Sequence, residues 1–254
     1  MLNIKEWTPQ DIAMSVWASA KNNEYSDDFF ESVTNHIIGM TDLSTFGAQQ
    51  LSMILWSYAT ADITHPLLFD KIAEHIVQLP NLNKFAPQSI SNILWAYAKR
   101  GYHTESLFEK VADHIVGQNV LLLEYNESLS MIIWSFAKAQ SNHPGLFEML
   151  TNHILSLDTL DDFPFKSLFS IVGGVSKFCA PPRELLEKVI KAVGEVEPIE
   201  LARLSMLMFP DQEDIFRFDD AKMMKLLLRL RLNRNYKEDG VYNVYVCVFA
   251  LCMV

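Results

Sequence analysis

The chain has 254 residues, half of them apolar, and a formal net charge of −10 at pH 7. This negative balance argues against a protein that coats nucleic acid indiscriminately, because such binding is mostly phosphate neutralisation, although it leaves room for a local basic track. The three cysteines form no CxxC pair, which argues against a disulfide framework or a cysteine-based zinc site and favours a reducing compartment.

The first residues carry neither an apolar signal segment nor an arginine- and serine-rich leader. We therefore expect either a protein without a leader or a fragment of a longer one. The longest largely apolar run, 241–254, is too short to cross a bilayer as a helix. The sequence thus predicts no membrane span.

One pattern returns along the chain at a fixed spacing. Residues 87–101 read PQSISNILWAYAKRG, and residues 12–21, 51–60 and 129–138 read IAMSVWASAK, LSMILWSYAT and LSMIIWSFAK. Their tryptophans, Trp17, Trp56, Trp95 and Trp134, recur with a 39-residue period. Because a period between 20 and 50 residues is typical of stacked repeats, the sequence predicts an all-α, right-handed solenoid of about five 39-residue helical hairpins with an irregular C-terminal cap.

The tryptophan spacing divides the predicted repeat domain, 1–201, into five units. These are 7–45, 46–84, 85–123, 124–162 and a weaker fifth unit, 163–201. Capping helices are predicted over 202–235, where 221–234 is a basic helical stretch that we expect to cover the last repeat rather than to contact a membrane surface or RNA. The tail, 236–254, fits no repeat and is predicted to be irregular.

Each unit is predicted to fold as two helices. In the third unit, helix A begins near Pro87, because proline at the first turn loses no hydrogen bond, and Gly101 ends it. Helix B follows over about 104–116, and Pro66 and Pro144 take the same place at the first turn of helix B in the second and fourth units. In the fifth unit Gly173 replaces the tryptophan and Gly174 follows, which predicts a weak or bent helix.

Two repeated columns invite a functional interpretation. The tryptophans are flanked by apolar residues at helical spacing, which favours packing in the core against the next unit. The histidines His36, His75, His114 and His153 recur with the same period. Stacked helices lie about 8–10 Å apart, too far for equivalent residues to share one metal ion, so these histidines are predicted to be partly buried imidazoles and no metal site is predicted.

The rest of helix A presents positions at offsets of four, eight and eleven residues, which share one side of a helix. This side carries a polar or thioether residue, a small residue and usually a lysine in each unit. Its members are Gln10, Met14, Ala18 and Lys21; Gln49, Met53, Ser57 and Thr60; Gln88, Asn92, Ala96 and Lys99; Glu127, Met131, Ser135 and Lys138; and Lys166, Ser170, Gly174 and Lys177.

Stacked in register, these positions would form a groove with small residues on its floor and a ladder of lysines, with Arg100 beside it. Lysines suit phosphates, and one or two side chains per unit suit one base of single-stranded RNA. The alternative is an ordinary solvated helix end, where a lysine complements the helix dipole. The candidates for RNA contact are Gln10, Met14, Lys21, Gln49, Met53, Gln88, Asn92, Lys99, Arg100, Met131, Lys138 and Lys177.

The helix A core Ser-x-x-Leu-Trp-Ala-Tyr-Ala, with Phe108 and Ile115 downstream, resembles the helical repeats of organellar RNA-binding proteins. These include octotricopeptide-repeat proteins of algal chloroplasts, FAST-kinase-like and RAP-domain proteins, and a subunit of a mitochondrial RNA-editing substrate-binding complex. The resemblance covers about residues 7–201 and is strongest over 46–156. It implies an α solenoid that binds single-stranded RNA in a mitochondrion or plastid and acts in RNA processing, stability, editing or translation.

No nucleophile–base set, phosphate-binding loop, HExxH or paired-carboxylate motif is visible, and no RAP domain follows the fifth unit. We therefore expect a non-catalytic protein without a cofactor. The acidic net charge favours a second interpretation, a protein–protein interaction scaffold, and protein partners in an RNA-processing complex fit both.

Overall fold

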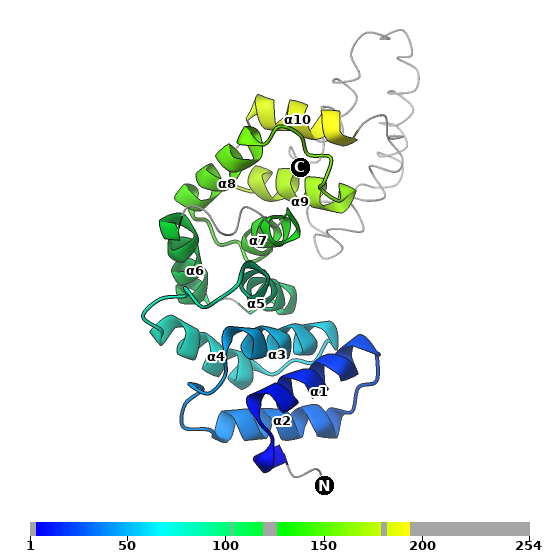
Figure 1. Cartoon of the computed structure of the whole chain (residues 1–254), viewed down its shortest axis with the longest axis vertical. Helices are drawn as coiled ribbons and strands as arrows, with labels where there is room; N and C mark the ends of the chain where they lie inside the picture. The colour runs from blue at the N-terminus through cyan, green and yellow to red at the C-terminus, as the bar shows by residue number, and fades with distance from the viewer. Residues whose placement is uncertain (1–3, 103, 119–125, 179–181, 194–254) are drawn as a thin grey trace. The chain divides into compact units, whose positions relative to one another are not determined.

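The computed structural model describes residues 4–102, 104–118, 126–178 and 182–193, and every regular element in them is a helix (Figure 1). The predicted all-α class is thereby confirmed for these residues. The chain divides into two compact units, with the boundary between Leu150 and Thr151. The predicted capping helices and tail, 202–254, lie outside the described residues.

The helices alternate along the chain as the two members of successive hairpins. The elements are η1 (Ile4–Glu6), α1 (Pro9–Lys21), α2 (Asp27–Gly39), α3 (Ala48–Thr60), α4 (Pro66–Gln78), α5 (Pro87–Arg100), α6 (Glu105–Gln118), α7 (Asn126–Lys138), α8 (Pro144–Ser156), α9 (Phe165–Ser176) and α10 (Arg183–Val193).

Alternate helices of the first unit pack on one another. The first helices of the hairpins make the most extensive contacts, α1 with α3, α3 with α5 and α5 with α7, and we call these four helices the A row. The second helices, α2, α4 and α6, pack in the same order and form the B row. This is the stacking that the 39-residue period predicts, because a single hairpin cannot bury both of its apolar sides.

The helix starts follow local chemistry. Pro66, Pro87 and Pro144 each occupy the first helical position, as predicted. At the start of α1, the backbone N–H of Asp11 donates to Thr8 Oγ1 at 3.2 Å and the backbone N–H of Thr8 donates to Asp11 Oδ2 at 2.9 Å. This capping box satisfies two backbone donors that the first turn leaves unpaired.

The ends of the A-row helices share one backbone geometry. A left-handed residue lies one or two positions after the last residue of each helix: Asn23, Asp62, Gly101 and Gln140, with φ between 54° and 68°. The next N–H then closes a bond to the carbonyl five residues earlier, as in Tyr102 N–H to Tyr97 O at 3.0 Å. Of these four residues, the sequence predicts only Gly101 as a helix end, because the left-handed conformation favours glycine most. Asparagine and aspartate adopt this conformation less readily than glycine but more readily than most other residues.

The fifth hairpin contains the two glycines for which a weak or bent helix is predicted. Gly173 and Gly174 replace bulkier residues, but α9 runs through both without interruption. Gly174 is buried, and so are the neighbouring Val172 and Val175. Burial of the flanking apolar side chains offsets the low helix propensity of glycine, which is a weak preference that tertiary packing overrides.

A repeated aromatic pair fills the space between the rows. Phe30 meets Tyr58 edge-on at a centroid distance of 4.9 Å, and Phe69 meets Tyr97 in the same way at 5.1 Å. The hydroxyl of Tyr58 donates to the carbonyl oxygen of Phe30 at 2.7 Å, and the hydroxyl of Tyr97 donates to that of Phe69 at 2.6 Å. In the next repeat Phe136 meets Phe108 at 5.1 Å and lacks the hydroxyl.

The hydroxyl that Tyr97 has and Phe136 lacks allows the effect of exchanging tyrosine and phenylalanine at these positions to be predicted. Phe136→Tyr is expected to raise the free energy of unfolding by up to about 1 kcal/mol, because its hydroxyl gains a buried hydrogen bond to the Phe108 carbonyl. Tyr97→Phe is expected to lower it by about 1 kcal/mol, because the bond to Phe69 is lost. Urea denaturation of both variants checks this, and destabilisation by Phe136→Tyr would contradict the equivalence of the two sites.

A second repeated contact joins successive B-row helices. The ammonium of Lys71 in α4 donates to the Ile38 carbonyl at 2.7 Å and to the Met40 carbonyl, both at the end of α2. Lys110 holds the same position one repeat later, in α6, and donates to the Leu79 carbonyl after α4 at 2.8 Å. In the second unit Lys188 repeats the contact with Leu155 at 2.9 Å. These lysines pair with helix-end carbonyls that have no partner within their own helix.

Methionine occupies the same position in α8, at Met149, so Lys110→Met is a change that the repeat tolerates sterically. It is expected to lower the free energy of unfolding by about 1–2 kcal/mol, because a charge-assisted hydrogen bond is removed. The matched control is Lys84→Met, an exposed lysine in the turn before α5, which is expected to change stability by less than about 0.5 kcal/mol. Equal midpoints of thermal unfolding for the two variants would contradict the stabilising role of this contact.

Candidate nucleic-acid interface

One side of each A-row helix remains accessible to solvent. Residues spaced by four, three and four positions lie along it, since these spacings keep side chains on one side of a helix. We call the combined surface of the four helices the A-row face. Its residues, all exposed or half-buried, are Gln10, Met14, Trp17 and Lys21; Gln49, Met53, Trp56 and Thr60; Gln88, Asn92, Trp95 and Lys99; and Glu127, Met131, Trp134 and Lys138.

The small residues predicted for the groove floor lie elsewhere, and this prediction was wrong for most of them. Ser57, Ala96 and Ser135 are completely buried. The hydroxyl of Ser57 donates to the Met53 carbonyl at 2.6 Å within its own helix, and Ser135 does the same to Met131 at 2.6 Å. Gly174 in the second unit is also buried, and Ala18 is the one exposed member of the set. Small side chains at this position let adjacent helices approach closely rather than contact a ligand.

The tryptophans take the place of these small residues on the face. All four are half-buried rather than enclosed in the core, and Trp56 packs against Trp95 of the next repeat, as the prediction of packing between units required. The indoles of Trp56 and Trp95 lie 6.5 Å apart with an angle of 26° between their planes. Each ring therefore packs along the contact between successive A-row helices and keeps part of its surface in solvent.

Two of the four indoles on the A-row face, those of Trp17 and Trp95, each have a lysine ammonium over the ring. Lys21 Nζ is 4.6 Å from the centroid of Trp17, and Lys99 Nζ is 4.7 Å from that of Trp95. Both distances are within the range of a cation–π interaction. Burial against the ring lowers the pKa of Lys99 from its usual value. Lys138 occupies the corresponding place in α7, and Thr60 replaces the lysine in α3.

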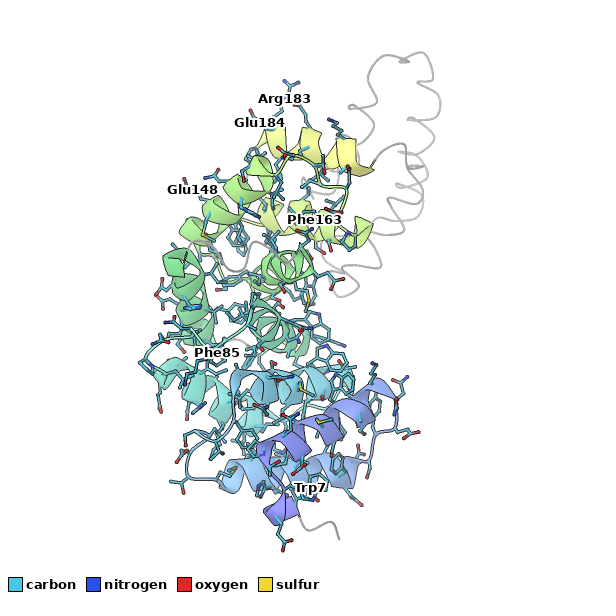
Figure 2. All side chains as sticks on the ribbon, viewed as in Figure 1. Trp7, Phe85, Glu148, Phe163, Arg183 and Glu184 are labelled. Atoms are coloured by element: carbon cyan, nitrogen blue, oxygen red, sulfur yellow. The ribbon has the colours of Figure 1, made fainter. Side chains whose placement is uncertain are left out.

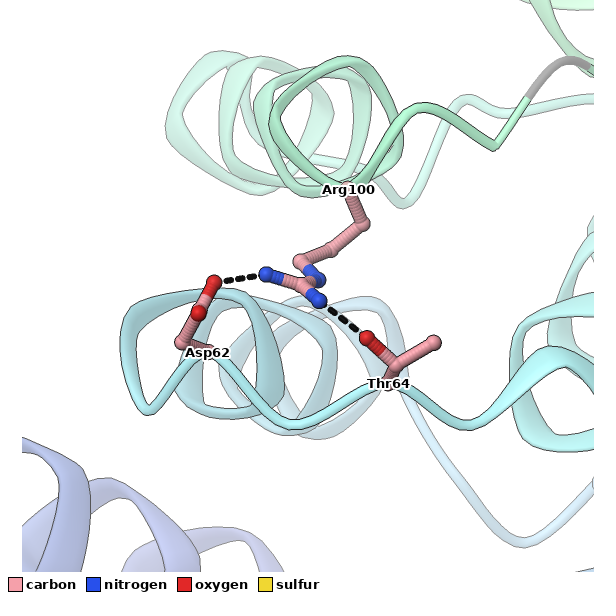
Figure 3. Close-up of polar contacts among 3 residues, drawn as sticks. All are labelled: Asp62, Thr64 and Arg100. Carbon is pink, nitrogen blue, oxygen red and sulfur yellow. Dashed lines mark hydrogen bonds and ion pairs between the residues drawn. The ribbon is translucent and has the colours of Figure 1, made fainter.

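Arg100 does not join the lysines, which corrects its assignment to the RNA-contacting set. Its guanidinium pairs with the Asp62 carboxylate and donates to Thr64 Oγ1, in the turn between α3 and α4 (Figure 3). The Arg100 side chain is only 14% exposed, whereas that of Asp62 is 83% exposed. Arg100 thus links the end of α5 to the preceding hairpin.

Lys177, the remaining member of the predicted ladder, and Lys166, the first residue of the same helix side in the fifth repeat, belong to the second compact unit. Lys177 is exposed and follows α9 directly. The side chain of Lys166 lies outside the described residues. Arg183 begins α10 in this unit (Figure 2). Its side chain pairs with Glu187 at 2.7 Å.

Charge is unequally divided between the two rows of the first unit. The A-row helices carry four basic residues, Lys21, Lys99, Arg100 and Lys138, against two acidic ones. The B-row helices carry two lysines against eight acidic residues, all of them exposed. These counts place the net negative charge on the B row and make the A row slightly positive. Both B-row lysines are bonded to carbonyls rather than to the acidic side chains.

The histidine column is half-buried in the B helices, as predicted. Burial lowers the pKa of His75, against the opposing effect of Asp42, and burial together with Lys110 lowers the pKa of His114. Both shifts favour the neutral imidazole. Among the residues that the structure describes, no three His, Cys, Asp or Glu side chains are grouped to hold a metal ion.

In the described ranges, no helix combines the length and the apolar character needed to cross a membrane. Sequence reasoning missed the tryptophans as surface residues, although their spacing of three from the methionine column and four from the lysine column was available as a signal. No protein-family model and no curated protein sequence matches the chain.

Proposed function

We propose that this chain binds single-stranded RNA along the A-row face, without catalysing a reaction. We further propose that about five 39-residue hairpins continue as a right-handed solenoid and that the protein acts in RNA processing, stability, editing or translation in a mitochondrion or plastid. The organellar context rests on the resemblance of the repeats to octotricopeptide and FAST-kinase-like repeats.

The observation that carries the proposal is that half-buried tryptophans and several lysines share one row of helices, while the opposite row is acidic. Single-stranded nucleic acid offers phosphates and the flat faces of unpaired bases, and proteins bind it with basic side chains and aromatic rings. An acidic B row repels phosphates, which favours binding on one side. The net charge of −10 is then compatible with RNA binding.

The test is a filter-binding titration of the chain with single-stranded RNA over a range of salt concentrations. Binding at low salt is expected, with log K falling linearly against log salt at about 0.7 per neutralised phosphate. Duplex RNA of equal length is the control and is expected to bind more weakly, because its bases are not accessible to a face of this kind. The absence of binding at low salt would contradict the proposal.

A protein-interaction scaffold is the second candidate, and the eight exposed acidic residues of the B row favour it. A basic peptide, such as oligolysine, is the probe. Binding of the peptide without binding of RNA would support this candidate and reject the first one.

A further inference from the structure

We propose that the four tryptophans of the A-row face form a stacking platform for unpaired nucleobases, with the phosphates between the bases held by Lys21, Lys99 and Lys138. This inference rests on the proposed function and names how the same face recognises its ligand. The added claim is that the protein contacts the bases as well as the phosphates. RNA binding as such could result from phosphate contacts alone.

The first support is the exposure of the indoles. The rings of Tyr58, Tyr97 and Phe108, between the two rows, are completely buried. The four tryptophans are half-buried at the same position of four successive repeats. The same ring therefore recurs, partly in solvent, along successive repeats, which is an arrangement that a ligand with repeated flat groups can use.

The second support is ring orientation. The core aromatic pairs of the repeats meet edge-on, with interplanar angles of 74° to 80°. Trp56 and Trp95 differ, since their planes are inclined by only 26°. The ring faces of the two indoles thus have similar orientations, as do those of successive bases in a strand. Successive bases of a single strand can stack on such faces whatever their sequence, because every base has a flat aromatic surface.

The third support is the placement of charge and of soft apolar groups around each ring. The ammonium of Lys21 lies over Trp17 and that of Lys99 lies over Trp95. A base that stacks on the same indole takes the place of this ammonium over the ring, and the displaced ammonium is then close to the phosphate of that base. Three positions before the tryptophan, on the same side of the helix, the repeats carry Met14, Met53, Asn92 and Met131. Methionine makes favourable contacts with aromatic rings, and the amide of Asn92 adds hydrogen-bonding groups beside the third indole.

The occupant that these observations favour is single-stranded RNA. An acidic peptide would also meet the lysines, but it has no flat surfaces to match the row of indoles. Single-stranded DNA shares both features except the 2′-hydroxyl, so it serves as one arm of the test.

The deciding experiment compares three probes of about 12 nucleotides, within the usual range of single-strand sites: oligoadenylate, its DNA counterpart and an abasic ribose-phosphate chain. Affinity and intrinsic tryptophan fluorescence are measured together. Oligoadenylate is expected to bind at least tenfold more tightly than the abasic chain and to quench the fluorescence, since stacking on an aromatic side chain favours binding by about tenfold or more per base. Weaker binding of the DNA would indicate that the 2′-hydroxyl is recognised as well.

The other outcomes separate the two proposals. Equal affinity for the abasic chain would overturn the stacking platform and leave RNA binding through phosphates intact. No binding of any probe would overturn both. Tighter binding of oligoadenylate without a change in fluorescence would place the bases away from the indoles and would also overturn the platform.

Variants then assign the effect to individual groups. The double variant Trp56→Leu/Trp95→Leu is expected to lose at least tenfold of the preference for oligoadenylate over the abasic chain while keeping its salt dependence. Lys99→Gln is expected to keep the preference and reduce the salt dependence. Trp7→Leu is the control, because Trp7 packs on Phe29 at 6.2 Å outside the A-row face. If the double variant does not fold, as judged by circular dichroism, the abasic comparison on the unaltered chain still decides.

Discussion

Phe69→Ala is expected to lower the free energy of unfolding by about 3–5 kcal/mol, the usual cost of truncating a buried phenylalanine. Phe69 is completely buried. Its ring lies 5.1 Å from that of Tyr97 and 4.4 Å from that of Tyr102, so one side chain of α4 connects two residues of the next hairpin. Its loss leaves a cavity between repeats and weakens the interface on which a stack of hairpins depends.

Urea denaturation followed by circular dichroism measures this effect. The matched control is Leu67→Ala in the same helix, because Leu67 is 62% exposed and its truncation is expected to cost less than about 0.5 kcal/mol. Because the stability of a repeat protein is close to a sum of local and interface terms, the Phe69 variant is also expected to unfold in a broader transition. Equal midpoints for the two variants would contradict the packing described for the aromatic pairs.

The triple variant Lys21→Gln/Lys99→Gln/Lys138→Gln is expected to weaken single-stranded RNA binding roughly a hundredfold at low salt, at up to about 1 kcal/mol for each lysine. The slope of log K against log salt is expected to fall in magnitude by about 2, because three phosphate contacts are removed. Filter binding measures both quantities. The midpoint of thermal unfolding is measured as well, because Lys21 and Lys99 also contact the Trp17 and Trp95 rings.

Arg100 supplies the control for this variant, since it is next to Lys99 in sequence and carries the same charge. Its guanidinium is paired with Asp62, so Arg100→Gln is expected to leave the salt slope unchanged. If Arg100→Gln and Lys99→Gln alter the slope equally, binding depends on net charge alone and not on the A-row face.

The sequence predicts the helices well because their signals are local. Proline marks the starts of α4, α5 and α8, Gly101 marks the end of α5, and the 39-residue period predicts the packing of successive hairpins. These features depend on backbone chemistry and on the alternation of apolar positions, both of which can be read from a single chain.

The candidate site is less predictable because it depends on which neighbour covers each side chain. Trp95 and Ala96 are adjacent in sequence, and apolar spacing alone favours the larger one for the core. In the structure Ala96 is completely buried and Trp95 is half-buried, because close approach of two A-row helices requires the small residue at their contact. Packing between repeats therefore decides the orientation of the face.

The contacts of Lys71 and Lys110 could not be predicted from the sequence either, because they also depend on the neighbouring repeat. A lysine on a predicted helix is normally assigned to solvent, but these two donate to carbonyls at the end of the preceding B-row helix. Their 39-residue spacing was visible in the sequence, whereas the unpaired carbonyls that they meet appear only when the hairpins are stacked.

Photocrosslinking of the chain to single-stranded RNA that contains 4-thiouridine, followed by mass spectrometry of the linked peptides, tests the location of the RNA most directly. Crosslinks are expected in peptides from α1, α3, α5 and α7, at the tryptophans and their neighbouring methionines. Few or none are expected in α2, α4 and α6, because their exposed side chains are mainly acidic. Crosslinks concentrated in the B row would contradict binding on the A-row face.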